Sequence, residues 1–259
     1  MSLRAREAEI RSGLLPLLAT PGVRRGIEVL SRDRFFLAFF LVSVSQGEGL
    51  GAAAVGIIGH EEVAQRIRDI RRQREEEASH EARTLSAARR HFPEYFVDGR
   101  YRFTESLQGR PYYLAVLEAN RSRLEALGRY SLLNPYLTTS FGYEVMVLLL
   151  YQAVAGAVAG AATLPEALRQ EISSLLHAIL DEEETHLGIV AQHDGLLATD
   201  RSGLSSAAVA ALRALELLGV EDYAFSAELA VRQLQSMMER LGEPAAYRAA
   251  IEAGRTGGH

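Results

Sequence analysis

The chain contains no cysteine and no lysine, and each absence excludes particular kinds of chemistry. Without cysteine there is no disulfide, no zinc–thiolate site and no cysteine nucleophile. All 28 basic residues are arginine, so a lysine Schiff base, including a pyridoxal phosphate anchor, is excluded as well. The lack of lysine is itself most simply explained by codon bias in the genome.

Basic residues are fewer than acidic ones, 28 against 33, which gives a formal net charge of −5. This balance argues against a nucleic-acid-binding protein, which needs basic residues to contact phosphates. Residues 1–11 are charged and lack the apolar segment of a signal peptide. We therefore expect a cytoplasmic protein.

Two long apolar stretches stand out in a chain that is 48% hydrophobic. Residues 35–59 contain one charged residue, Glu48, and residues 145–164 contain none. Both stretches are long enough to cross a membrane, and a helix that is apolar on all sides is buried either in lipid or in a protein core. We favour the core, because a charged helix follows each stretch and a glutamate such as Glu48 or Glu144 is costly in lipid.

The hydrophobic pattern predicts an all-α protein that forms one domain over residues 1–259. Asp33 or Ser31 is expected to cap the first core helix. The core, about residues 33–194, is expected to consist of two helical hairpins joined by a long connection, with helices at about 33–59, 61–91, 134–162 and 165–193. Further helices are expected at about 2–20, at about 111–127 within the connection, and in a C-terminal appendage of about 205–253.

The core helices carry a repeated arrangement of glutamate and histidine. A Glu-x-x-His step occurs at Glu77 and His80 and again at Glu183 and His186. Each step follows an apolar helix with an isolated glutamate, so the chain reads Glu, Glu-x-x-His, Glu, Glu-x-x-His. The two isolated glutamates are Glu48 and Glu144.

This arrangement suits a pair of metal ions. Residues three apart on a helix share a face, so each Glu-x-x-His step can point both side chains the same way. A buried carboxylate must be paired, coordinated or neutralised, and four of them in one core would repel one another. Two divalent cations would cancel that repulsion, and carboxylate with imidazole suits iron or manganese. The alternative, that these are solvent-facing acids, explains Glu48 and Glu144 poorly.

In order and spacing, the series resembles the ligands of the ferritin-like di-iron carboxylate superfamily, over about residues 33–194. The segment 182–188, Glu-Glu-Glu-Thr-His-Leu-Gly, is similar to the fourth-helix motif of aldehyde-deformylating oxygenases and related di-iron oxygenases. The resemblance implies a ferritin-like four-helix bundle, with a long crossover between its second and third helices and extra helices at both ends.

The resemblance also implies a role for each ligand. Glu77 and Glu183 would bridge two iron ions, although manganese or a mixed iron–manganese pair would accept the same ligands. The terminal pairs would be Glu48 with His80 and Glu144 with His186. One branch, the N-oxygenases, adds a histidine one turn before the last glutamate, but this chain has Ile179 there, so that branch fits poorly.

Glycines around Glu48 distinguish the first helix. Gly47, Gly49 and Gly51 weaken a helix interior, so the helix is expected either to kink near the site or to allow a neighbouring helix to approach closely.

Several other residues lie near the expected site. Tyr151 is seven residues after Glu144 on the same helical face, where it could be redox-active, a hydrogen-bonding neighbour of the metals or an ordinary core tyrosine. Gln73 and Gln152 could hydrogen-bond the ligand histidines. Glu81, four residues after Glu77, could be an alternative ligand, but a surface or second-shell acid is expected. His193 is expected to interact with the dipole at a helix C-terminus. Glu182 and Glu184 are expected to be solvated.

The leading functional hypothesis is a di-iron oxidase or oxygenase that activates dioxygen to oxidise a small, mostly apolar substrate. Its partners would be that substrate, dioxygen and an electron donor, without nucleic acid or membrane; a homodimer is one option for its assembly. One alternative is a ferroxidase or metal-storage protein of ferritin type. Another is a metal-free helical interaction or membrane protein.

Overall fold

The computed structural model describes residues 3–58, 70–104, 112–187, 193 and 195–253. Over these residues the chain is almost wholly helical, which confirms the predicted all-α class. Within this described part, the strands are the two short ones of a single hairpin.

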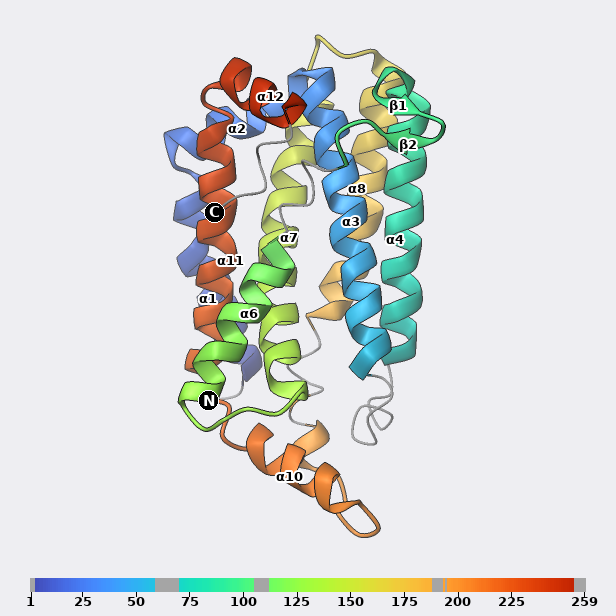
Figure 1. Ribbon diagram of the computed structural model, residues 1–259. Helices are drawn as coiled ribbons and strands as arrows, with labels where there is room; N and C mark the ends of the chain where they lie inside the picture. The colour runs from blue at the N-terminus through green and yellow to red at the C-terminus, as the bar shows by residue number, and fades with distance from the viewer. Residues whose placement is uncertain (1–2, 59–69, 105–111, 188–192, 194, 254–259) are drawn as a thin grey trace.

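Four long helices lie side by side and form the part of the fold that carries the expected ligands (Figure 1). They are α3 (Arg34–Ile58), α4 (Ile70–His91), α7 (Leu133–Ala159) and α8 (Glu166–His186). Helix α3 packs against α4, α4 against α8, α8 against α7, and α7 against α3. The apolar stretches predicted as core helices correspond to α3 and α7, so their side chains face other helices of the same chain.

The boundaries of these helices follow the sequence signals closely. Asp33 caps α3, because its Oδ1 accepts hydrogen bonds from the backbone N–H groups of Phe35 (2.8 Å) and Phe36 (3.2 Å). Helix α8 ends at His186, earlier than the predicted end near His193. The predicted start of the second core helix, near residue 61, lies outside the described residues.

Helix α7 is buried on most of its surface because other helices cover its remaining sides. Helices α1 (Leu3–Leu18), α2 (Pro21–Arg32), α6 (Tyr112–Ala126), α10 (Ser206–Leu215) and α11 (Val220–Arg240) all pack against it. Buried Asp222 on α11 pairs with Arg123 of α6 at 2.5 Å and with Arg129 at 2.8 Å. The C-terminal part predicted as an appendage therefore contributes α11 to the cover of the core, while α10 lies at one end (Figure 1).

The long connection between α4 and α7 holds a small structure that the sequence did not predict. A 3-10 turn, η2 (Pro93–Tyr95), leads into an antiparallel hairpin of β1 (Phe96–Val97) and β2 (Arg100–Tyr101). Asp98 and Gly99 form its turn with φ of 49° and 74°, which suits a two-residue hairpin. The last helix, α12 (Pro244–Glu252), falls within the predicted C-terminal appendage of about 205–253.

Two helices have the length and composition of membrane spans. The apolar windows are Arg34–Ala53 and Leu133–Ala159, and 72% of each window is buried inside the chain. The core helix of a soluble protein meets the same criteria, so these helices are compatible with a soluble protein and with a membrane protein.

Candidate metal centre

The six predicted ligands meet in the interior of the four helices. Each is at most 4% exposed. Glutamate and histidine atoms form two groups, and the four atoms of each group lie within 4.8 Å of one another. The first group is Glu48, Glu77, His80 and Glu183, and the second is Glu77, Glu144, Glu183 and His186.

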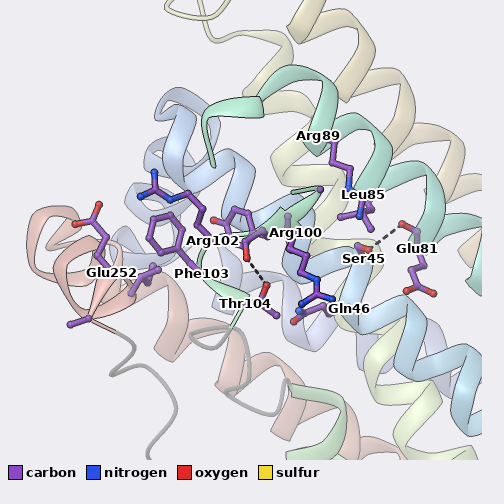
Figure 2. Close-up of a pocket in the computed structure, with 15 residues that line it drawn as sticks. Ser45, Gln46, Glu81, Leu85, Arg89, Arg100, Arg102, Phe103, Thr104 and Glu252 are labelled. Atoms are coloured by element: carbon purple, nitrogen blue, oxygen red, sulfur yellow. Dashed lines mark hydrogen bonds between the residues drawn. The ribbon is translucent and has the colours of Figure 1, made fainter. Parts of the chain in front are cut away.

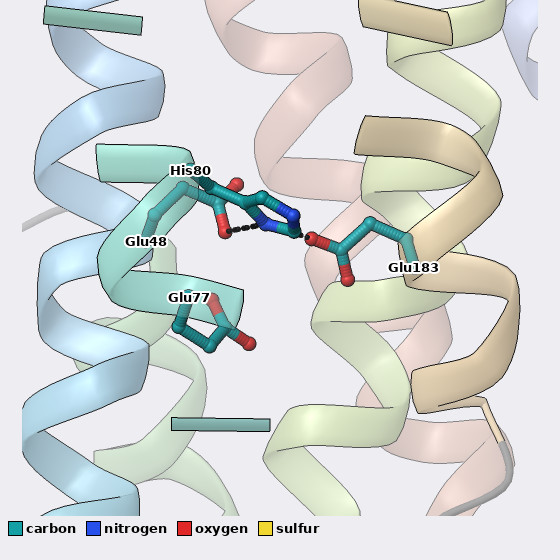
Figure 3. Close-up of side chains that lie close together, drawn as sticks. All are labelled: Glu48, Glu77, His80 and Glu183. Carbon is teal, nitrogen blue, oxygen red and sulfur yellow. Dashed lines mark hydrogen bonds and ion pairs between the residues drawn. The ribbon is translucent and has the colours of Figure 1, made fainter. Parts of the chain in front are cut away.

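The two groups share Glu77 and Glu183. These residues lie on α4 and α8, the two helices that follow the apolar ones in sequence. Figure 3 shows the first group, with Glu48 reaching in from α3, Glu77 and His80 from α4, and Glu183 from α8. Because the groups overlap in two carboxylates, one ion in each would be linked by shared ligands.

Both imidazoles turn Nδ1 toward the carboxylates of the groups. His80 Nδ1 lies 3.0 Å from Glu183 Oε1 and 3.4 Å from Glu48 Oε2. His186 Nδ1 lies 2.8 Å from Glu183 Oε2 and 3.6 Å from Glu77 Oε1. Nδ1 is therefore the nitrogen placed to bind a cation.

The outer nitrogens meet carboxylates from the opposite helix. His80 Nε2 on α4 lies 2.7 Å from Glu182 Oε2 on α8. His186 Nε2 on α8 lies 3.0 Å from Glu76 Oε2 on α4. A carboxylate on the second nitrogen fixes the tautomer and ring orientation of a ligand histidine. The arrangement is reciprocal, since each helix supplies the histidine of one pair and the carboxylate of the other.

These contacts correct three predictions. Glu182 is half-buried and bonded to His80 rather than solvated. Gln73 hydrogen-bonds Glu77 rather than a histidine, and Gln152 is exposed. A signal for the true partners was present, because both steps are Glu-Glu-x-x-His and the first glutamate of each doublet is the partner.

An arginine supports each outer carboxylate. Arg83, three residues after His80, lies 3.2 Å from Glu182 Oε1. Arg72, four residues before Glu76, lies 2.7 Å from Glu76 Oε1. Burial raises the pKa of Glu76, but hydrogen bonds from Arg72 and His186 outweigh it and lower that pKa, which keeps Glu76 ionised.

The electrostatics of the metal-free site divide the carboxylates into two kinds. Burial, reinforced by the neighbouring carboxylates, raises the pKa of Glu77 and of Glu144 well above the ordinary value. Burial acts against ionisation of Glu183 too, but hydrogen bonds from Glu144 and both imidazoles lower its pKa. Burial also disfavours charge on His80, yet its bonds to Glu183 and Glu48 raise its pKa to about 10. Without a cation, the protons retained by Glu77, Glu144 and His80 therefore reduce the repulsion between the buried carboxylates.

Two carboxylate oxygens are left over from this proton network. Oε2 of Glu77 and Oε2 of Glu144 are buried with no hydrogen-bond partner among the described residues. A buried acceptor without a partner is costly, whereas a cation would satisfy it. The donors are carboxylate oxygens and imidazole nitrogens, so these residues could hold a metal ion.

Tyr151 is in contact with the site. It is 2% exposed, and its hydroxyl donates a 2.7 Å hydrogen bond to Glu48 Oε1. Tyr151 is thus a buried core tyrosine with one satisfied hydroxyl that bonds a predicted ligand, so two of the predicted alternatives describe it. Burial and the Glu48 charge raise the Tyr151 pKa, so the hydroxyl stays protonated and can donate. Tyr136 and Tyr143 are also within electrostatic range of the carboxylates, and the sequence reading did not single them out.

The glycines of α3 allow close approach, and the helix is continuous through them. A Cβ on Gly51 would lie 3.0 Å from Glu77 Oε2, and one on Gly49 would lie 2.8 Å from the Glu81 carboxyl carbon. Of the two predicted alternatives, close approach is the one observed.

Two further candidates lie outside the ligand groups. Glu81 is exposed at the surface beside α3. His193 is buried away from the ligands, with Nε2 lying 3.3 Å from the carbonyl oxygen of Leu215.

Comparison with known proteins adds no relative to this description: no family model, no curated protein and no solved structure matches the chain.

Proposed function

We propose that this protein is a ferritin-like di-metal enzyme, with two iron ions at the site, that activates dioxygen to oxidise a small organic substrate. In this proposal, α3, α4, α7 and α8 are the four helices of a ferritin-like bundle. The single observation that carries it is the overlap of two buried four-residue groups in Glu77 and Glu183. Two carboxylates shared between two groups are what a dinuclear site needs.

The residues would divide the work as follows. Glu77 and Glu183 would bridge the ions, and each histidine would bind through Nδ1. The terminal carboxylates would be Glu48 in the first group and Glu144 in the second. When bound, a reduced iron pair supplies electrons to dioxygen, which organic side chains alone cannot do.

The surrounding chain would hold this centre in place and keep water out. Glu182 and Glu76 would fix the imidazole rings through Nε2. Tyr151 would hold Glu48 through its 2.7 Å hydrogen bond. The helices around the ligands are densely apolar: Phe40 contacts Tyr151 edge to face, with ring centroids 6.0 Å apart. A mostly apolar substrate is therefore the kind that this environment favours.

The first experiment measures metal in protein produced in medium supplemented with iron and manganese. We expect about two ions per chain in the unaltered protein and a large loss in the double variant Glu144→Ala/His186→Ala. Glu184→Ala is the matched control, because Glu184 is exposed beside the ligand Glu183. An absence of metal in all three proteins would overturn the proposal.

The second experiment tests the chemistry. Reduced, iron-loaded protein is mixed with dioxygen, and oxygen uptake is compared with free iron and with the double variant. Uptake faster than both supports the oxidase function. Accumulation of mineral iron inside a large assembly would instead indicate a storage protein.

A further inference from the structure

A pocket of about 810 Å³ lies on the outer side of the α3–α4 hairpin (Figure 2). Its walls come from four separate places: α3, α4, the segment around β2, and the end of α12. The volume is in the range of small-molecule sites. Residues distant in sequence therefore combine into one concave surface.

Apolar and basic groups share the wall. The apolar part includes Val42, Leu85, Phe103 and Ile251. The basic part is three arginines, Arg89, Arg100 and Arg102.

These arginines differ from many others in the protein in lacking acidic partners. Arg89, Arg100 and Arg102 make no ion pair within the part of the chain that the structure describes. Of the two glutamates in the wall, Glu252 is already bonded to Arg248 at 3.0 Å. Positive charge in the pocket is thus left to pair with something from solution.

Local geometry explains why the arginines gather there. Glu81, Leu85 and Arg89 follow one another at four-residue intervals, so they share a face of α4. Arg100 and Arg102 flank Tyr101, and side chains alternate along an extended segment, so both can face away from the core that Tyr101 enters. Figure 2 shows the Arg100 guanidinium directed toward Gln46 of α3.

We propose that the pocket binds an organic carboxylate with an apolar body. The carboxylate would accept hydrogen bonds from Arg100 and Arg89. The apolar body would lie against Leu85 and Phe103. Arginine binds carboxylates through two parallel N–H bonds, and the apolar wall distinguishes such a ligand from a bare inorganic anion.

A second hollow of about 790 Å³ shows why charge alone is insufficient. It also contains three arginines, which are Arg24, Arg25 and Arg32, but the hollow is formed by α2 and its flanks together with Pro244, with Val29 as its one aliphatic side chain. It offers little apolar wall, so we expect no carboxylate selectivity there. This hollow supplies the control variants.

The pocket is close to the proposed metal centre but does not depend on it. Ser45 and Glu81 form part of the wall, and they are three and one residues from the ligands Glu48 and His80. The Ser45 hydroxyl donates to the Glu81 carbonyl at 3.1 Å, which ties the two helices together there. Carboxylate binding in the pocket is therefore expected whether or not metal is bound.

The test is calorimetric titration of the full chain with octanoate, octylammonium and octanol, with and without prior metal removal. We expect octanoate to bind, and the other two to bind at least about 10-fold more weakly. Arg89→Gln/Arg100→Gln should weaken octanoate binding by about 10-fold or more. Arg24→Gln/Arg25→Gln should leave it unchanged.

The substituted arginines are exposed and make no ion pair in the described part of the chain, so the variants should retain the fold, which circular dichroism checks. Failure of octanoate to bind would overturn the proposal. Equal binding of octylammonium, or equal octanoate binding by the Arg89→Gln/Arg100→Gln variant, would overturn it too. Octanoate binding that survives metal removal would separate this result from the fate of the proposed oxidase function.

Discussion

The two halves of the buried centre are built alike but are not equally held. The first half-site consists of Glu48 and His80, with Glu182 behind the histidine; the second consists of Glu144 and His186, with Glu76 behind it. In both, an imidazole presents Nδ1 inward and Nε2 to a carboxylate of the facing helix. The repeat of the sequence doublet Glu-Glu-x-x-His accounts for this likeness.

The terminal carboxylates differ. Glu48 Oε1 accepts a hydrogen bond from Tyr151 at 2.7 Å, whereas Glu144 Oε2 has no partner among the described residues. The carboxyl group of Glu144 hydrogen-bonds Glu183 inside the cluster, but it has no donor from outside the cluster of the kind that Tyr151 gives Glu48. The comparison indicates a fixed first half-site and a more adjustable second one, which is where an incoming ligand would be accommodated more easily.

The largest expected effect comes from changing Glu183, a carboxylate that belongs to both half-sites. Glu183 is in contact with both imidazoles, so Glu183→Gln should abolish binding at both half-sites. Glu48→Gln should remove mainly one ion, because Glu48 belongs to one group. Elemental analysis of metal per chain measures both.

The control for this pair is Glu184→Gln, at an exposed position beside Glu183, which should bind as much metal as the unaltered chain. If Glu183→Gln and Glu48→Gln lost the same single ion, Glu183 would not be a bridge.

Stability of the metal-free protein should depend on pH because His80 holds a proton tightly. Its pKa is raised from 6.5 to about 10 by Glu183 and Glu48, against the opposing effect of burial. Between those values the folded state binds more protons than the unfolded state, so the free energy of unfolding should fall as pH rises. The contribution is fully present below pH 6.5, is lost through about pH 10, and could amount to several kcal/mol.

Urea unfolding of chelator-treated protein across this range measures the slope. His80→Gln should flatten the curve. The affinity of the protein for metal should instead rise with pH, because a ligand histidine must be neutral and protons compete with the cation. A metal-free curve that rises over the same range would contradict the proton network.

Changing the carboxylates bonded to the outer histidine nitrogens, Glu182 and Glu76, should alter the two half-sites one at a time. Glu182→Gln should weaken metal binding at the first half-site by about 10- to 100-fold, and Glu76→Gln should do the same at the second. Stepwise titration with Mn²⁺ resolves the two affinities. Each change should leave the other half-site nearly unaltered, and equal weakening of both by one variant would mean that the halves are not independent.

The sequence predicts the buried cluster of glutamates and histidines well because burying a carboxylate is so costly. Isolated glutamates in apolar helices have few explanations, and Glu48 and Glu144 both lie in the predicted cluster. The all-α class followed from the same apolar periodicity, with α3 and α7 close to their expected bounds.

Contacts between helices were predicted less well, because residue spacing describes one helix at a time. Glu182 reaches His80 across 102 positions, and helical periodicity carries no information on which faces will meet. The β1–β2 hairpin escaped prediction for a related reason: its strands are two residues long, too short for an alternating pattern. The pocket that it helps to form was therefore invisible in the sequence.

The smallest expected effect tests the asymmetry itself. Tyr151→Phe removes the hydroxyl that holds Glu48 and leaves the ring in place, so the two terminal carboxylates should become more alike. Leaving a buried Glu48 oxygen without its donor should cost the metal-free protein about 1–3 kcal/mol, measured by urea unfolding. With metal bound the cost should shrink, because the cation satisfies the same carboxylate. The control Tyr130→Phe changes a tyrosine at the surface and should be neutral. An equal loss of stability with and without metal would mean that Tyr151 supports packing alone, and the difference between the half-sites would then have to come from the helices rather than from this hydrogen bond.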